Sequence, residues 1–123
     1  MIKVYEYAGC STCRNALKFL DKHGVKYEKH AIVDTPPTKA ELKMMLAALK
    51  DDGGTFKNLF NTSGVQYREL GISDKIKAGL TESQAIDLLV VNGKLIKRPF
   101  VILGADKGFV GFKEDVWKKH FKV

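Results

Sequence analysis

Two cysteines separated by two residues stand near the start of the chain, and they are its only cysteines. Cys10 and Cys13 follow an apolar run, Ile2 to Ala8, that is typical of a strand, and they begin a segment with helical periodicity. One helical turn brings residues i and i+3 to the same face, so the two sulfurs can form a small-loop disulfide. At a helix N-terminus, free N–H groups and the helix dipole favour a thiolate, which is the nucleophilic form. The motif therefore predicts a redox pair with a reactive Cys10.

The segments around this pair predict an ordered alternation of strands and helices. Ser11 or Thr12 can cap the first helix, which Gly24 ends. Capping boxes at Thr38–Glu41 and Thr81–Gln84 predict two further helices. The expected elements, in chain order, are a strand within 2–8, a helix within 10–24, a strand at 25–33, helices within 38–92, strands at 100–103 and 109–112, and a helix at 114–121 with Val116, Trp117 and Phe121 facing inward.

This order favours an α/β protein with a thioredoxin-like fold. We expect one domain over residues 1–123, in which 1–34 and 94–123 form a four-stranded mixed sheet with its helices. Residues 38–92 are then a helical insertion packed on that sheet. In such a fold the chemistry lies where the first strand ends and the next helix begins, which is the position of the two cysteines.

Arg98 and Pro99 directly precede the strand at 100–103. Proline lacks an N–H and therefore lies at a strand start or edge. In thioredoxin-type folds a proline at this point is cis and faces the redox cysteine, so we expect Arg98 beside the two sulfurs. A guanidinium there lowers the pKa of a thiol and binds an oxyanion or a carboxylate. The alternative is a solvent-exposed arginine beside a strand.

Three segments together resemble the ArsC-like and Spx/MgsR family: Cys10–Arg14, Tyr67–Gly71 and Leu95–Pro99. The resemblance covers essentially the whole chain, and the Leu-Ile-Lys-Arg-Pro segment is its most specific part. It implies a catalytic role for Cys10, Cys13 and Arg98. It also implies a binding role for the residues around them, namely Ser11, Thr12, Asn61, Thr62 and Pro99. An ordinary turn at 61–64 is the alternative for that segment.

The chain departs from the glutaredoxin-coupled arsenate reductases of this family at two positions. Those enzymes use three arginines around the oxyanion, whereas this chain has Asn61 at one such position and Gly111 near another. Each missing cation removes charge-assisted contacts worth about 1.5–3 kcal/mol. We therefore do not expect efficient arsenate reduction. Cys13 supplies an internal resolving thiol, as in the Spx branch.

Two functions follow from the resemblance and from the cysteine pair. The first is a thiol–disulfide oxidoreductase or a glutathione- or glutaredoxin-coupled reductase without a bound cofactor. Cys10 attacks a disulfide, a glutathione adduct or an oxyanion, and Cys13 resolves the intermediate. Glutathione, glutaredoxin or thioredoxin then restores the dithiol. The second is an Spx-like regulator that contacts RNA polymerase and responds to oxidation of the pair.

Composition limits the other possibilities. The net charge of +7 comes from scattered lysines and favours a solvated surface. An acidic partner or an oxyanion substrate is the alternative, and no motif for direct nucleic-acid binding is present. No apolar stretch approaches the roughly 18 residues that span a bilayer, and the first residues do not resemble a signal peptide. We expect a cytoplasmic monomer.

No metal site is predicted. The chain has three histidines, and they do not complete a four-ligand set with the cysteines: His23, His30 and His120.

Overall fold

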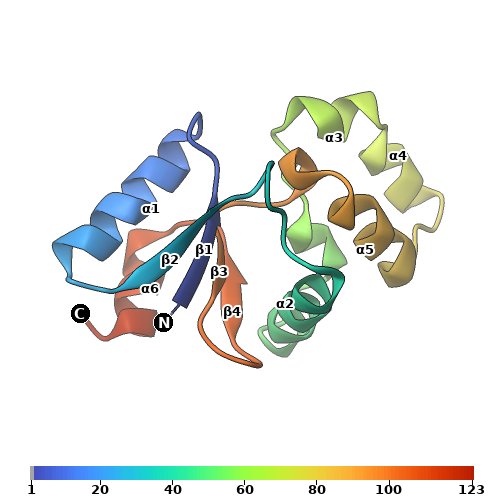
Figure 1. Cartoon of the computed structure of the whole chain (residues 1–123). Helices are drawn as coiled ribbons and strands as arrows, with labels where there is room; N and C mark the ends of the chain where they lie inside the picture. Colours follow the sequence, from blue (N-terminus) through green and yellow to red (C-terminus); the bar gives the residue numbers. More distant parts are fainter. Residues whose placement is uncertain (1) are drawn as a thin grey trace.

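The computed structural model describes residues 2–123 and shows a four-stranded mixed sheet with helices on both faces (Figure 1). The strands are β1 (Ile2–Glu6), β2 (Tyr27–Ala31), β3 (Phe100–Ile102) and β4 (Gly108–Val110). Their order in the sheet is β2-β1-β3-β4. β1 pairs in parallel with β2 and antiparallel with β3, and β3 pairs antiparallel with β4. The predicted fold class, α/β with a thioredoxin-like mixed sheet, is confirmed.

Helices form the two outer layers of the molecule. They are α1 (Ser11–Lys22), α2 (Lys39–Asp51), α3 (Val65–Glu69), α4 (Ile72–Lys77), α5 (Glu82–Val90) and α6 (Glu114–Phe121), with short 3-10 turns η1 (Phe56–Leu59) and η2 (Gly93–Leu95). α1 and α6 lie on one side of the sheet, and α2 to α5 lie on the other (Figure 1). The chain between β2 and β3 is thus helical, as the periodicity of its apolar residues predicts.

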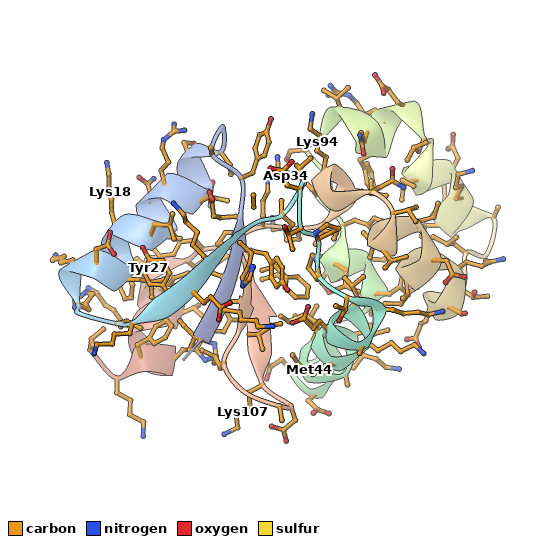
Figure 2. The ribbon with its side chains drawn as sticks, in the orientation of Figure 1. Lys18, Tyr27, Asp34, Met44, Lys94 and Lys107 are labelled. Atoms are coloured by element: carbon orange, nitrogen blue, oxygen red, sulfur yellow. The ribbon has the colours of Figure 1, made fainter. Side chains whose placement is uncertain are left out.

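The sheet separates two clusters of buried apolar side chains, which Figure 2 shows on either side of the strands. Successive strand residues point to opposite faces. Val4 and its partner Val101 accordingly belong to the cluster under α1 and α6, whereas Tyr5 and its partner Phe100 belong to the cluster under α2 and α5. This alternation determines which helices each strand residue packs against. It therefore determines which face of the sheet α1 packs on.

Both predicted capping boxes are confirmed. The side chain of Thr38 accepts the N–H of Glu41 at 3.1 Å and the Thr38 N–H donates to Glu41 Oε1 at 3.0 Å. The same exchange joins Thr81 and Gln84 at the start of α5. Each box satisfies backbone N–H groups that the first helical turn leaves without partners. The two longest helices of the second layer therefore begin where their sequences predict.

Two local predictions are wrong. Neither Ser11 nor Thr12 caps α1, because Cys10 is its N-cap and no side chain bonds the free N–H groups there. Those groups therefore stay available to a thiolate. Val116 does not face inward, since its side chain is 41% exposed, whereas Trp117 is only 1% exposed. Successive helical residues are rotated by about 100°, so the face that buries Trp117 turns Val116 outward.

Glu41 joins the start of α2 to the sheet. Its carboxylate accepts the Tyr5 hydroxyl at 2.7 Å and the Thr38 N–H at 3.0 Å, and it pairs with Lys3 Nζ at 3.3 Å. Partial burial opposes ionisation, but these three donors outweigh it and hold the pKa of the carboxyl below its usual value. Such a group contributes stability at pH values above its unfolded pKa, and the contribution is lost as the pH falls through the folded value.

We expect Glu41→Gln to lower the free energy of unfolding at pH 7 by about 1–2 kcal/mol, because charge-assisted hydrogen bonds become neutral ones. The difference from wild type should be smaller at pH 3, because the wild-type carboxyl takes up its proton as the pH falls through its lowered folded pKa. Urea unfolding at both pH values measures it. Glu69→Gln, at an exposed glutamate, is the matched control. A difference that is the same at both pH values would contradict the assignment.

Gly93 opens η2 against the segment that follows β2. A Cβ at this position would collide with the carbonyl oxygen of Ile32, so the two backbones meet directly. We expect Gly93→Ala to lower the free energy of unfolding by more than about 2 kcal/mol, because backbone must move to admit the methyl group. Gly104→Ala is the control, since its Cβ meets nothing within 4 Å. Thermal unfolding of both variants measures the effect, and equal melting temperatures would refute the contact.

Candidate active site

The loop between β1 and α1 carries Cys10 to the N-terminus of the helix. Cys10 is the N-cap, with φ −100° and ψ 116°. Its N–H donates to the carbonyl oxygen of Tyr7 at 3.0 Å, and its own carbonyl accepts the N–H of Arg14 at 3.1 Å. These bonds fix the backbone on both sides of the thiol. Cys10 is partly exposed, whereas Cys13, one turn later, is completely buried, and both are free thiols.

The surroundings of Cys10 favour its thiolate. Partial burial opposes ionisation, but the N–H and thiol of Cys13 and the guanidinium of Arg98 stabilise the negative charge more strongly. The pKa of the Cys10 thiol is therefore lower than usual. A thiol with a lowered pKa and access to solvent has the properties of a nucleophile.

The surroundings of Cys13 have the opposite effect. Burial raises the pKa of the Cys13 thiol to about 12, and the neighbouring Cys10 thiolate adds to the rise. The backbone of Tyr7 and the charge of Arg98 oppose this increase without cancelling it. Cys13 thus remains a neutral thiol beside an ionised one. Two titratable groups whose surroundings push their pKa values apart take different roles in a reaction.

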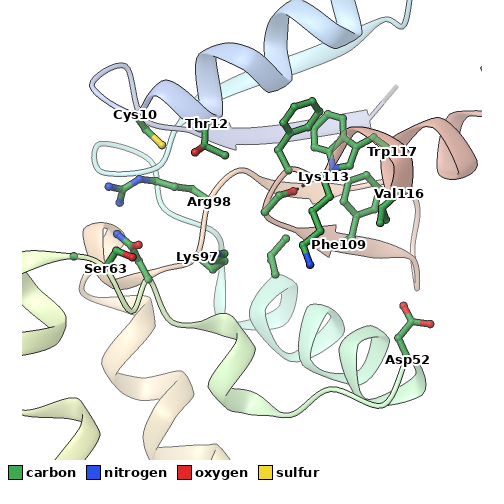
Figure 3. A pocket seen from close by; sticks show the side chains of 15 residues that line it. Cys10, Thr12, Asp52, Ser63, Lys97, Arg98, Phe109, Lys113, Val116 and Trp117 are labelled. Atoms are coloured by element: carbon green, nitrogen blue, oxygen red, sulfur yellow. Dashed lines mark hydrogen bonds between the residues drawn. The ribbon is translucent and has the colours of Figure 1, made fainter.

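Arg98 is held beside Cys10 by contacts on two sides. The Arg98–Pro99 peptide bond is cis, as predicted. The Nη1 atom donates to the carbonyl oxygen of Lys94 at 3.2 Å, and the guanidinium carbon lies 4.7 Å from the ring centroid of Tyr7. Figure 3 shows the guanidinium beside Cys10, at the mouth of a hollow. Cation–π stacking and one carbonyl fix its position while other N–H donors stay available to a substrate.

A hollow of about 870 Å³ opens next to the thiol of Cys10. Four residues singled out in the sequence line it: Cys10, Thr12, Asn61 and Arg98. The other four predicted site residues do not line it: Ser11, Cys13, Thr62 and Pro99. Ser63 and Gly64, which follow Thr62, do line it. The turn at 61–64 therefore reaches the site, as the family resemblance implies.

Several residues of the hollow were not predicted as site residues. Lys97 and Lys113 add two cations, and Val116 and Trp117 form an apolar wall (Figure 3). Phe112 also lines the hollow. The hollow is also lined by Asn61 and Gly111, which the family resemblance places at one arginine position of the arsenate reductases and near another. Lys97 directly precedes Arg98, so its place in the sequence is a signal that could have identified it. Lys113 gives no comparable signal, because only the hairpin geometry brings it to the site.

Residues 2–123 hold no group of three or more histidine, cysteine, aspartate or glutamate side chains that could bind a metal ion. None of the helices in this range has the length and apolar character needed to cross a membrane.

Comparison with known proteins agrees with this geometry. Residues 5–120 match the ArsC family. The uncharacterized protein YusI of Bacillus subtilis is 41% identical over 117 residues, which are 95% of each chain. The global transcriptional regulator Spx of Streptococcus pyogenes is 30% identical over 119 residues, covering 94% of this chain and 81% of Spx. A crystal structure of an ArsC family related protein from Bacteroides fragilis superposes with a TM-score of 0.86 at 42% identity, covering 96% of this chain and 95% of that one. The chain belongs to the ArsC family.

Proposed function

We propose that the protein is a thiol–disulfide oxidoreductase that uses Cys10 and Cys13 as its redox pair. The observation that carries this proposal is the opposed ionisation of the two thiols at the N-terminus of α1. A lowered pKa suits the attacking group, and a buried neutral thiol one helical turn away suits the group that resolves the intermediate. Arg98 acts as the cation that stabilises the thiolate.

In the first step the Cys10 thiolate attacks one sulfur of a substrate disulfide. The new bond joins Cys10 to that sulfur, the substrate S–S bond breaks, and the second substrate sulfur leaves as a thiolate that takes a proton from water. Arg98 lies beside the reacting sulfurs and stabilises the negative charge as it passes to the leaving group. The enzyme is then covalently linked to half of its substrate.

In the second step Cys13 loses its proton to water and attacks the sulfur of Cys10. The Cys10–Cys13 disulfide forms, and the remaining half of the substrate leaves as a thiol. Formation of the first adduct removes the negative charge of Cys10, which is one cause of the raised pKa of Cys13. Cys13 therefore ionises more readily once Cys10 is bonded, so the attack of the second thiol follows that of the first.

A second thiol source closes the cycle. Two glutathione molecules, or one dithiol of a glutaredoxin or thioredoxin, reduce the Cys10–Cys13 disulfide and become oxidised. The net reaction moves two electrons from that donor to the substrate disulfide. The residues near Cys10 supply positioning and charge, and no bound cofactor enters the proposal.

Turnover of a mixed-disulfide substrate tests the proposal. Wild-type protein with glutathione should reduce the mixed disulfide of glutathione and cysteine, whereas Cys10→Ser should show only the background rate. Wild-type turnover that does not exceed that of Cys10→Ser would refute the enzymatic function.

The curated relatives named as Spx regulators support a second candidate, a regulator that binds RNA polymerase and responds to oxidation of the pair. A pull-down from lysate with and without diamide tests it, since binding of the polymerase should change on oxidation. The reduction potential of the pair discriminates between the two. A value near −270 mV, about that of thioredoxin, suits a reductase, and a value of about −200 mV or above suits a sensor.

A further inference from the structure

β4 lies at the edge of the sheet and has a neighbouring strand on one side only. The N–H of Gly111 donates to the carbonyl of Pro99 at 2.9 Å, and the Lys107 carbonyl accepts the N–H of Leu103 at 2.9 Å. Because antiparallel pairing alternates, the odd-numbered residues of this hairpin arm direct their backbone groups toward β3. The backbone groups of Val110 therefore face away from the sheet, where no strand of the described chain pairs with them.

This free edge forms part of the hollow beside Cys10. Five consecutive residues, 109–113, line the hollow, so the edge of β4 and the segment after it are continuous with the space next to the thiol. Its volume of about 870 Å³ lies near the upper end of the roughly 300–1,000 Å³ of small-molecule pockets. An exposed strand edge binds an extended peptide through main-chain hydrogen bonds, and nearby pockets select its side chains.

The hollow is positively charged. Lys97, Arg98 and Lys113 line it, and none of them has a carboxylate partner among the ion pairs of residues 2–123. Among residues 2–123, the one acidic residue that lines the hollow is Asp52, at the end of α2. A Cβ at Gly111 would lie 3.3 Å from Cε of Lys97, so the lysine side chain passes directly beside the residue that follows β4. The cations and the segment 109–113 thus line the same hollow.

An apolar surface adjoins the charged one. The exposed side of Val116 faces the hollow together with Phe112 and Trp117 (Figure 3). Val116 points outward, which the apolar pattern of α6 does not predict, and its side chain therefore adds an apolar surface to the hollow. A ligand that matches all three features has an extended backbone, carboxylates and an apolar side chain.

We infer that the disulfide attacked by Cys10 is carried by an extended, acidic segment of another protein, which adds to the outer edge of β4 and places its carboxylates beside Lys97 and Lys113. This inference rests on the proposed thiol–disulfide chemistry and names its substrate class. The covalent step is the one already described, in which Cys10 takes one substrate sulfur and the other leaves as a thiol.

Three disulfides that carry the same leaving group, 2-mercaptoethanol, test the charge selection. They are bis(2-hydroxyethyl) disulfide and two seven-residue peptides with a central cysteine, flanked in one by glutamates and in the other by lysines. We expect kcat/KM to be about tenfold higher for the acidic peptide than for the basic one at low salt. The ratio should fall toward one in 0.5 M sodium chloride, because salt screens these contacts.

Lysine variants test whether the lysines of the hollow cause the preference for the acidic peptide. The double variant Lys97→Ala with Lys113→Ala should reduce the acidic-to-basic ratio about three- to tenfold. Lys118→Ala with Lys119→Ala is the matched control, because these exposed lysines of α6 do not line the hollow, and it should keep the wild-type ratio. Equal loss in both double variants would overturn the assignment, since it would show a general effect of net charge.

Backbone methylation of the acidic peptide tests the strand pairing. A strand directs alternate N–H groups to opposite edges. Two forms of the peptide, one N-methylated at its odd positions and the other at its even positions, therefore have opposite edges blocked. One isomer should lose about tenfold in kcat/KM and the other should not. Equal kcat/KM values for the two isomers would overturn the docking, and so would equal values for the acidic and basic peptides. If bis(2-hydroxyethyl) disulfide were still reduced in either case, the proposed chemistry would remain intact. No reduction of any of the three disulfides would overturn both.

Discussion

Replacement of Cys13 by alanine is expected to slow turnover strongly and to leave the protein joined to its substrate through Cys10. The Cys10 thiolate keeps its position at the N-terminus of α1, so the first attack proceeds, but no internal thiol is left to release the adduct. Intact mass spectrometry without reductant should show an increase equal to half of the substrate disulfide, and reductant should reverse it. Turnover with glutathione in excess should fall by at least an order of magnitude.

Controls separate this outcome from damage to the fold. Cys13 is completely buried, and Cys13→Ala removes its thiol without placing a new polar group there. Cys10→Ser should form no adduct, and the double variant should behave in the same way. If Cys13→Ala turned over substrate at the wild-type rate, an external thiol would resolve the adduct and Cys13 would have no catalytic role.

Replacement of Arg98 by alanine should raise the pKa of the Cys10 thiol. Partial burial already opposes ionisation of this thiol, and Arg98 is one of the groups that offset it, together with the N–H and thiol of Cys13. Without the guanidinium, the thiolate population at pH values below the pKa falls, and the rate of iodoacetamide alkylation at pH 6.5 should fall by up to about tenfold. Absorbance of the thiolate at 240 nm, followed against pH, measures the shift directly.

The same variant should change the redox equilibrium. A stabilised thiolate favours the reduced dithiol, so its loss should make the Cys10–Cys13 disulfide harder to reduce and its potential more negative. Arg14→Ala is the matched control, because Arg14 follows the motif but donates to the carbonyl of Ala8 and is not among the groups that lower the pKa of Cys10. Arg98→Lys should retain part of the effect, since it keeps the charge and loses the planar donor. An unchanged titration in Arg98→Ala would remove Arg98 from the site.

The sequence was sufficient for features that depend on local chemistry. Both capping boxes carry their own partners within one helical turn, and the C-x-x-C spacing brings both thiols to the first turn of α1. The cis bond before Pro99 and the position of Arg98 came from family resemblance and fold, and the structure has the bond as expected.

Features that depend on tertiary packing were not predictable in this way. Ser11 and Thr12 have the side chains of caps, yet the N-cap is Cys10, because the chain enters α1 with that residue held to Tyr7. The direction of Val116 depends on how Trp117 is buried, since both are apolar and neighbours in sequence. The positive charge of the hollow depends on Lys113, which the hairpin brings to the site. None of these positions has a distinguishing pattern in the sequence itself.

The sheet divides the apolar interior into two clusters that can change in sequence independently of each other. The nucleophile is carried by α1, whose buried residues pack with α6, whereas the turn at 61–64 belongs to the layer packed on the opposite face. Because the two clusters do not share side chains, substitutions in the second layer can reshape the surface presented to a client without repacking the helix that activates the thiol. The chemistry of Cys10 can thereby stay the same while the surface presented to a client changes in one half of the molecule.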